Sequence, residues 1–194
     1  METISAPFFT PQIIRIATLG VLIGILCLAA CETTTTGQIP TLSKEARRNY
    51  SPEEQQVFAA IQRCDSQLFA AVFGTCDSAR VRALISADLE FYHDKSGITN
   101  SSNNFLLSIA GICSSEFHPS RELQPGSMEI FLLKNNDSLY GVVQTGMHTF
   151  YEKPSGQSKQ LRSTARFTHL WVLEKSNWKL KRVLSYDHQV PEVK

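Results

Sequence analysis

Hydrophobic and polar residues alternate most regularly near the end of the chain, in two segments separated by a short polar break. The segments are residues 165–173 and 178–188, and the break is residues 174–177. Alternation with a period of two is typical of β-strands that bury one face. The pattern predicts a hairpin whose second strand buries one set of side chains: Trp178, Leu180, Arg182, Leu184 and Tyr186.

A long amphipathic helix is predicted ahead of the strands. Ser51, Pro52 and Glu54 match a helix start, in which serine caps the amino end, proline occupies the first turn and glutamate closes a capping box. Apolar residues then recur at helical spacing as far as Gly74, which predicts about 22 residues of helix with one broad buried stripe.

The remaining segments complete an α+β pattern. Two shorter helices are predicted, one beginning near Cys76 and one beginning near Thr99. Helices first and strands afterwards predict an α+β domain over residues 51–190, with helices on one face of an antiparallel sheet. The predicted strands are residues 89–93, 128–133 and 139–151 and the two strands of the final hairpin.

The amino end has the pattern of an export signal. Residues 16–30 carry no charge, follow Arg15 and end in small residues. This run is shorter than the roughly 20 apolar residues that cross a bilayer. Its end, Leu28–Cys31, resembles the lipobox of bacterial lipoproteins, in which the cysteine is lipidated and becomes the new amino terminus.

This interpretation divides the chain into three parts. Residues 1–30 are an export signal, residues 31–50 are the lipidated Cys31 with a polar tether, and residues 51–190 are the folded domain. The predicted protein is held in a membrane of the bacterial cell envelope by lipid and faces the periplasm or the exterior. The alternatives are a short transmembrane anchor and a cleaved signal with an incidental cysteine.

Composition narrows the class of protein only slightly. Hydrophobic residues make up 42% and charged residues 19% of the 194 residues, which is typical of one globular domain. The formal net charge of +1 gives no reason to expect a nucleic-acid partner. Five cysteines without a C-x-x-C pair argue against a zinc ribbon or a redox dithiol site, and no cofactor is predicted.

Four stretches together resemble the nuclear transport factor 2-like superfamily, also called ketosteroid-isomerase-like or cystatin-like, and within it a bacterial branch of unestablished function. The resemblance implies a cone in which a strongly curved antiparallel sheet wraps over the long amino-terminal helix and a pocket opens at the wide end. The superfamily contains isomerases, dehydratases, hydrolases and binding modules, so it implies a fold more than a function. The stretches are Phe91–Gly97, Arg121–Ser127, Gly146–Phe150, and Phe167–Trp171 with Trp178–His188.

Asp94 is the candidate catalytic carboxylate, with His93 beside it. In the superfamily's isomerases a general-base aspartate follows Ala-Asp and a strand of similar length, and residues 87–94 keep that spacing. A carboxyl group buried in an apolar cone has a raised pKa, which suits proton abstraction next to a carbonyl. The alternative is a turn aspartate that caps the loop of residues 95–97.

The five histidines all follow the long predicted helix, at His93, His118, His148, His169 and His188. No two of them have the local spacing with which one element supplies two metal ligands, so hydrogen-bonded histidines are expected instead of a metal site. The expected pocket combines aromatic, imidazole and guanidinium groups that suit a partly apolar ligand. Its predicted residues are Tyr92, His148, His169, Trp171, Arg182 and Tyr186.

A serine hydrolase is not expected. Asp187 and His188 are adjacent, so in a regular strand their side chains point to opposite faces and cannot pair as orienter and base. Ser185 therefore gives no triad.

Cys76 and Cys113 are candidates for a disulfide, because domains of exported proteins are commonly oxidised. The alternative is two small buried thiols. Cys64 lies on the apolar stripe of the long helix and is expected to be buried and inert.

The leading functional hypothesis is a lipid-anchored envelope protein whose pocket binds a small, partly apolar ligand or a protein partner. One alternative is an acid–base enzyme of ketosteroid-isomerase or dehydratase type that uses Asp94 and a histidine. Another is a dimerising interaction module, because this fold often forms dimers through its open sheet face.

Overall fold

The structure is a computed structural model that describes residues 48–191, and these form a single α+β arrangement. The predicted export signal, the predicted lipidation site Cys31 and most of the predicted tether lie outside the described residues. No helix in residues 48–191 combines the length and the apolar character needed to cross a membrane. The helical segments are α1 (Pro52–Phe69), the π-helical η1 (Ala70–Thr75), α2 (Ser78–Leu84) and α3 (Ser102–Cys113).

Within residues 48–191, seven strands form one sheet in the order β2-β1-β7-β6-β5-β3, and β4 also pairs with β5. All neighbours are antiparallel except β1 and β7, which are parallel, so the sheet is mixed where an antiparallel one was predicted. No tight turn joins β1 to β7, and their relative direction is therefore not set by a hairpin. The strands are β1 (Ile85–His93), β2 (Gly97–Asn100), β3 (Ser120–Leu123), β4 (Glu129–Asn135), β5 (Ser138–Glu152), β6 (Gln160–Glu174) and β7 (Asn177–Gln189).

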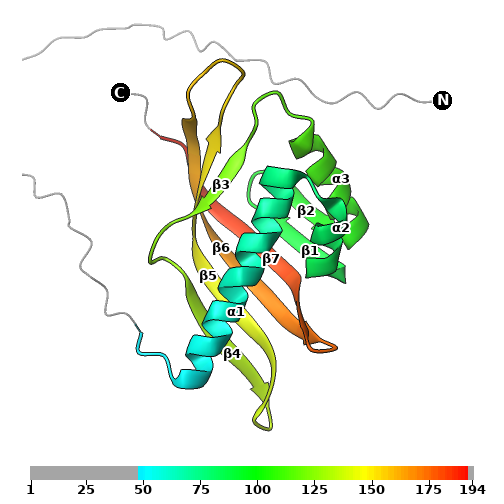
Figure 1. Cartoon of the computed structure of the whole chain (residues 1–194), viewed down its shortest axis with the longest axis vertical. Helices are drawn as coiled ribbons and strands as arrows, with labels where there is room; N and C mark the ends of the chain where they lie inside the picture. Colours follow the sequence, from blue (N-terminus) through cyan, green and yellow to red (C-terminus); the bar gives the residue numbers. More distant parts are fainter. Residues whose placement is uncertain (1–47, 192–194) are drawn as a thin grey trace, which may run out of the picture. The chain divides into compact units, whose positions relative to one another are not determined.

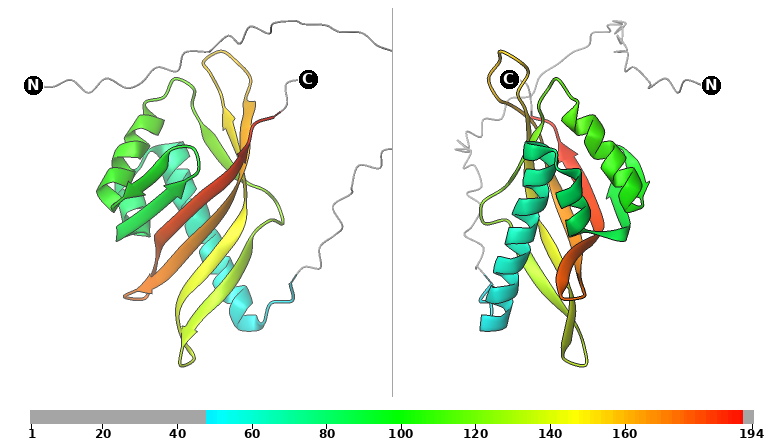
Figure 2. Two further views of the ribbon diagram at one scale, coloured as in Figure 1. Left: turned by 180° about the vertical axis from the view of Figure 1, so that it is seen from behind. Right: turned by 45° about the vertical axis from the view of Figure 1, so that its right-hand side comes forward.

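The helices cover one face of the sheet. α1 crosses in front of β5, β6 and β7, and α3 lies beside β1 and β2 (Figure 1). Seen from behind, the opposite face of the strands carries no helix within the described residues (Figure 2). The predicted architecture, a curved sheet packed over a long amino-terminal helix, is confirmed.

α1 begins where the sequence predicts. The Ser51 hydroxyl accepts a hydrogen bond from the N–H of Glu54, and the Glu54 carboxylate accepts one from the N–H of Ser51 at 2.8 Å. The α-helix ends at Phe69, and a π-helical turn continues to Thr75. The helical region thus has the predicted extent, and its last turn is wider than an α-helical one.

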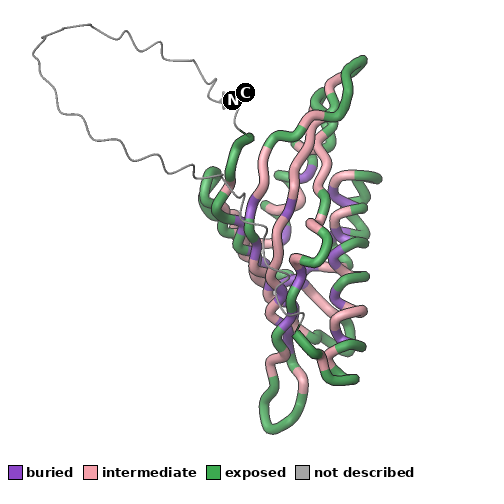
Figure 3. Tube along the Cα trace, turned by 90° about the vertical axis from the view of Figure 1, so that its left-hand side faces the viewer, coloured by how far each residue is buried: buried purple, intermediate pink, exposed green. Residues whose placement is uncertain are grey.

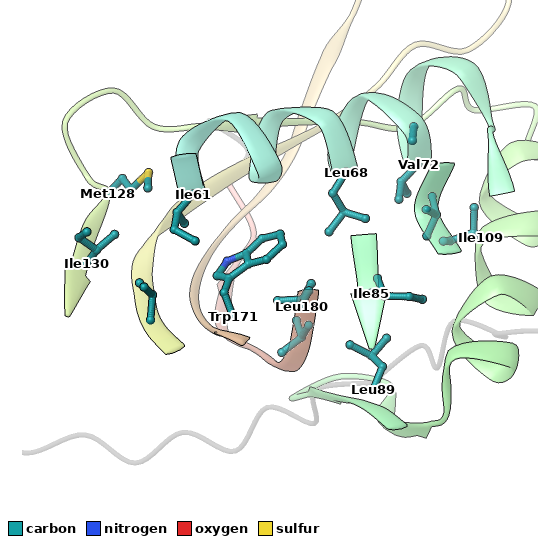
Figure 4. Close-up of a cluster of buried hydrophobic side chains, with 14 of the residues drawn as sticks. Ile61, Leu68, Val72, Ile85, Leu89, Ile109, Met128, Ile130, Trp171 and Leu180 are labelled. Atoms are coloured by element: carbon teal, nitrogen blue, oxygen red, sulfur yellow. The ribbon is translucent and has the colours of Figure 1, made fainter. Parts of the chain in front are cut away.

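The core fills the space between α1 and the sheet (Figure 4). Ile61 and Leu68 of α1 lie over Trp171 of β6 and Leu180 of β7, and all four side chains are at most 1% exposed. Burying one side chain of this size contributes about 1.5–3 kcal/mol. Figure 3 shows the buried positions concentrated between the helices and the strands, with exposed positions at the loops.

A bulge in β7 decides which of its side chains face the helices. The pairing of β7 with β6 shifts by one residue at Lys181, which has no partner in β6. An extra residue reverses the in–out alternation beyond it. Val183 and Ser185 are therefore buried. The predicted face was wrong for the residues that follow Leu180 in the alternating pattern: Arg182, Leu184 and Tyr186.

Candidate functional site

A cavity of about 400 Å³ lies between the helices and the inner face of the sheet. Aromatic and aliphatic side chains from α1, η1, α3 and the strands make up most of its lining. Within residues 48–191, no lysine, arginine, aspartate or glutamate side chain lines it. Its polar groups are His93, His148, His169, Ser185 and three further hydroxyls.

A buried ion pair beside the cavity links α1 to β3. Arg121 Nη1 lies 2.7 Å from Asp65 Oδ2, and neither side chain is more than 3% exposed. Gln144 of β5 donates from Nε2 to Asp65 Oδ1 at 3.2 Å and accepts at Oε1 from Trp171 Nε1 at 2.7 Å. Because a carboxylate only accepts and an indole only donates, both ends fix the orientation of the Gln144 amide.

The sequence indicates part of this network, but neither Asp65 nor Arg121 was among the predicted site residues. Asp65 lies on the apolar stripe of α1 between Ile61 and Leu68, where a charge requires a buried partner. That partner is Arg121, 56 positions away, and no local pattern in the sequence connects the two.

His148 of β5 has a fixed tautomer. Its Nδ1 accepts a hydrogen bond from Arg121 Nε at 2.5 Å, and a guanidinium can only donate. Burial, with the charge of Arg121, holds the pKa of His148 far below its usual value, so the ring is neutral. The proton of the neutral ring is therefore on Nε2. This nitrogen is buried and has no hydrogen-bond partner among residues 48–191.

His169 of β6 has the opposite arrangement. Its Nδ1 lies 3.2 Å from Gln144 Oε1, an oxygen that can only accept, so Nδ1 carries the proton and Nε2 is an acceptor. Burial and the charge of Arg121 lower the pKa of His169 well below its usual value. The two rings lie 6.1 Å apart, and both line the cavity. The lining of the cavity thus contains two neighbouring neutral imidazoles, one with its proton on Nε2 and the other with its proton on Nδ1.

A second polar cluster lies where β1 and β7 end side by side. Asp94 Oδ1 is 2.5 Å from His188 Nδ1, and Asp94 Oδ2 accepts a hydrogen bond from the N–H of His188 at 3.1 Å. Although partial burial opposes the change, these hydrogen bonds lower the pKa of Asp94. The predicted base is therefore an ionised carboxylate paired with an imidazole, not a lone carboxyl group with a raised pKa.

His93 lies against this cluster. Its ring stacks on that of His188 with 4.4 Å between centroids. Its Nδ1 accepts hydrogen bonds from the backbone N–H groups of Lys95 at 3.0 Å and Ser96 at 3.3 Å, so the neutral ring carries its proton on Nε2. Burial, and secondarily the charge that His188 would carry, lower the pKa of His93.

The same cluster is the arrangement closest to a metal site in the described part of the chain. Ligand atoms of His93, Asp94 and His188 lie within 4.8 Å of one another. However, the Nδ1 lone pair of His93 already accepts two backbone hydrogen bonds. The ring planes of the two histidines are also only 22° apart, so their in-plane lone pairs do not converge on one point. The geometry favours hydrogen bonding over coordination.

Four of the predicted pocket residues do not line the cavity. Trp171 is wholly buried in the core and bonded to Gln144. The other three, Tyr92, Arg182 and Tyr186, lie on the outer side, where Tyr92 donates to Glu90 and Arg182 pairs with Glu90. Strand alternation explains Tyr92, since its neighbour His93 points inward, and the β7 bulge explains Arg182 and Tyr186.

A disulfide joins Cys76, after η1, to Cys113 at the end of α3, with 5.9 Å between the Cα atoms. Val72 of η1 and Ile112 of α3 lie next to it in space and line the cavity. The bond therefore ties together two walls of the cavity. Cys64 is only half-buried, and this burial raises the pKa of its thiol.

Comparisons with known proteins give matches in structure but none in sequence. No family model matches the chain, and no curated protein matches it. An NTF2-like protein with a cystatin-like fold from Novosphingobium aromaticivorans has a TM-score of 0.56 at 10% identity, covering 69% of this chain and 80% of that one.

Two further solved structures are similar over most of their length. A hexachlorocyclohexane dehydrochlorinase from Novosphingobium barchaimii has a TM-score of 0.54 at 15% identity, covering 73% of this chain and 94% of that one. The association domain of CaMKII from C. elegans has a TM-score of 0.57 at 9% identity, covering 70% of this chain and 98% of that one. An enzyme and an association domain thus share this architecture.

The chain has the nuclear transport factor 2-like, cystatin-like fold, as its sequence pattern predicted. At these identities the similarity concerns the fold alone, so function has to be argued from the cavity.

Proposed function

We propose that this domain binds a small, largely apolar and uncharged molecule that carries an oxygen acceptor. The observation that carries the proposal is the Nε2–H of His148. This residue lines the cavity, and its buried Nε2–H has no partner among residues 48–191. Leaving a buried polar group unsatisfied costs about 1–3 kcal/mol. A carbonyl, ether or hydroxyl oxygen of a ligand would offset this cost.

The rest of the lining restricts the chemistry of the ligand. The cavity volume of about 400 Å³ lies in the range typical of small-molecule sites. An ion would lose its hydration without gaining an opposite charge, because no charged side chain among residues 48–191 lines the cavity. The Nε2 acceptor of His169 would suit a ligand that also has a hydroxyl group near its oxygen acceptor.

Prodan, a neutral naphthyl ketone whose emission reports on hydrogen bonding, is a suitable probe. A chain that begins at residue 33 keeps every core residue that the structure describes and can be assayed without membranes. We expect saturable binding, and we expect His148→Leu to weaken it roughly tenfold, because one buried hydrogen bond to the ketone is lost. Fluorescence titration measures both the affinity and the shift in emission.

Two further variants control this measurement. His148→Gln retains an acceptor for Arg121 and an N–H for the ligand, so its affinity should stay within about threefold of the original. His118→Asn changes a histidine outside the cavity lining and should bind normally. Equal affinity in His148→Leu and the original chain, with both folded by thermal unfolding, would contradict the proposal.

We also propose that the domain is held at a membrane of the cell envelope by lipid on Cys31. The support is the uncharged run of residues 16–30 followed by the lipobox-like Leu28–Cys31. We expect Cys31→Ser to abolish acylation and to move the protein from the detergent phase to the aqueous phase in a phase partition. Cys27→Ser, within the predicted signal, is the control. Unchanged intact mass and partitioning in Cys31→Ser would exclude the lipid anchor.

A further inference from the structure

We infer that Ser185, His188 and Asp94 form a nucleophile–base–orienter triad on the wall of the cavity and cleave carboxylic esters by acyl transfer to Ser185. This inference rests on the proposed ligand pocket and names a substrate class for it. It also reverses the sequence-based exclusion of a serine hydrolase, in which Asp187 was the only partner considered for His188.

The hydrogen bonds set the direction of proton transfer. Ser185 lines the cavity, and its Oγ lies 3.5 Å from His188 Nε2. On the other side of the ring, His188 Nδ1 lies 2.5 Å from Asp94 Oδ1. An ionised carboxylate only accepts, so Nδ1 carries the ring proton and Nε2 presents its lone pair to the serine hydroxyl. This is the tautomer that a general base needs.

A local distortion of β7 brings serine and histidine to the same side. Asp187 has a left-handed backbone with φ of 57°, and the pairing of β7 with β6 shifts in this region. The left-handed residue interrupts the alternation that would place Ser185 and His188 on opposite faces. Aspartate is one of the few residues other than glycine that adopt this conformation routinely, so the chain accommodates the irregularity at this position.

Backbone hydrogen bonds at the end of β1 hold Asp94, the orienter, in place. The N–H of Asp94 donates to the carbonyl oxygen of Ser185 at 3.1 Å, while the N–H of His188 donates to the Asp94 carboxylate. Asp94, Ser185 and His188 are therefore joined to one another by hydrogen bonds of both backbone and side-chain groups. Such fixation resembles that of known triads, which are recognised by geometry and not by order in the sequence.

Several other serine hydroxyls in the described chain have backbone partners. Ser108 and Ser114 each donate to a backbone carbonyl oxygen of their own helix. Ser185 Oγ instead has an imidazole nitrogen as its partner, inside a largely apolar cavity. Its register neighbour His93 also lines the cavity and carries its proton on Nε2, a donor suited to the carbonyl oxygen of an ester.

The reaction is balanced without a cofactor. Ser185 Oγ attacks the ester carbonyl carbon as its proton passes to His188 Nε2. The tetrahedral intermediate collapses, the bond to the alcohol oxygen breaks, and that oxygen leaves with the proton from His188. Water then attacks the acyl-serine while His188 again accepts and returns the proton. This step releases the carboxylic acid and restores the hydroxyl of Ser185. One ester and one water are consumed.

The test uses the full chain, purified in a nonionic detergent, with an alkyl fluorophosphonate as the probe and p-nitrophenyl butyrate as the ester. We expect one phosphonyl adduct, mapped by peptide mass spectrometry to Ser185, and ester hydrolysis above the buffer rate. Ser185→Ala should lose the adduct and the hydrolysis. His188→Gln and Asp94→Asn should slow both by at least about 100-fold. Ser114→Ala, at an exposed serine, should behave like the original chain.

The outcomes separate this inference from the ligand pocket on which it rests. Prodan binding without an adduct or hydrolysis would overturn the triad and leave the pocket standing. An adduct at another serine, or hydrolysis that survives in Ser185→Ala, would also overturn it. Absence of Prodan binding, adduct and hydrolysis together would overturn both. Prodan binding that persists in Ser185→Ala, with labelling lost, would support both.

Discussion

Replacing Arg121 with leucine is expected to lower the free energy of unfolding by about 3–5 kcal/mol, among the largest single effects in this domain. The reason is that Asp65, only 1% exposed, would be left as an uncompensated charge in the core. Arg121 also lies 3.7 Å over the ring of Phe69 and donates to His148, so the substitution removes packing as well as charge. Urea denaturation of the chain from residue 33 measures the change.

A double substitution separates charge from packing. Asp65→Leu with Arg121→Leu removes both charges, and we expect it to be more stable than either single variant, because no unpaired ion remains. The exposed pair Lys181–Asp88, also 2.7 Å apart, is the matched control, and Lys181→Met should cost less than about 1 kcal/mol. If Arg121→Leu cost no more than Lys181→Met, the buried pair would not hold the core as argued.

The overall fold was predictable because its signals are local. The capping box at Ser51 and the helical spacing after it specify α1 within a few residues. The hairpin of β6 and β7 follows from two alternating runs joined by a short polar break. Each of these features is fixed by residues close together in the chain, and none needs knowledge of tertiary contacts.

The candidate site was only partly predictable because tertiary pairing decides it. One unpaired residue, Lys181, reverses the face of β7, and the alternating sequence contains no sign of it. The left-handed backbone at Asp187 then returns His188 to the side of Ser185. His188 and Asp94 are 94 positions apart, and adjacency in the sequence suggested Asp187 as the partner instead. A rule for regular strands therefore failed at the irregular positions.

Asp65 illustrates a signal that the sequence did contain. Its place on an apolar helical stripe requires a buried partner, even though Arg121 could not be named from the sequence. The tautomers of His148 and His169 depend on that network, through Arg121 and Gln144. The protonated nitrogens of these two cavity-lining imidazoles could therefore be assigned only after the long-range contacts were known.

Loss of the disulfide between Cys76 and Cys113 is the second large effect expected. Replacing both cysteines with serine should lower the free energy of unfolding by about 3–4 kcal/mol, because the bond closes a loop with a sequence separation of 37 residues and restricts the unfolded chain. The change should also weaken Prodan binding, since the bond ties η1 to α3, and Val72 and Ile112 of these elements line the cavity. Denaturant titration and fluorescence titration measure the two effects on the same preparation.

Cys64, the unbridged cysteine within residues 48–191, provides the control. Cys64→Ser changes a half-buried thiol outside the bridge, and we expect it to cost about 1 kcal/mol and to leave Prodan affinity unchanged. The oxidation state is checked by alkylating the denatured protein without reductant, which should modify Cys64 and neither bridged cysteine. Alkylation at Cys76 and Cys113 would show two thiols instead of a bond. In that case the walls of the cavity would be held together by side-chain packing alone, and the double serine variant should lose little stability.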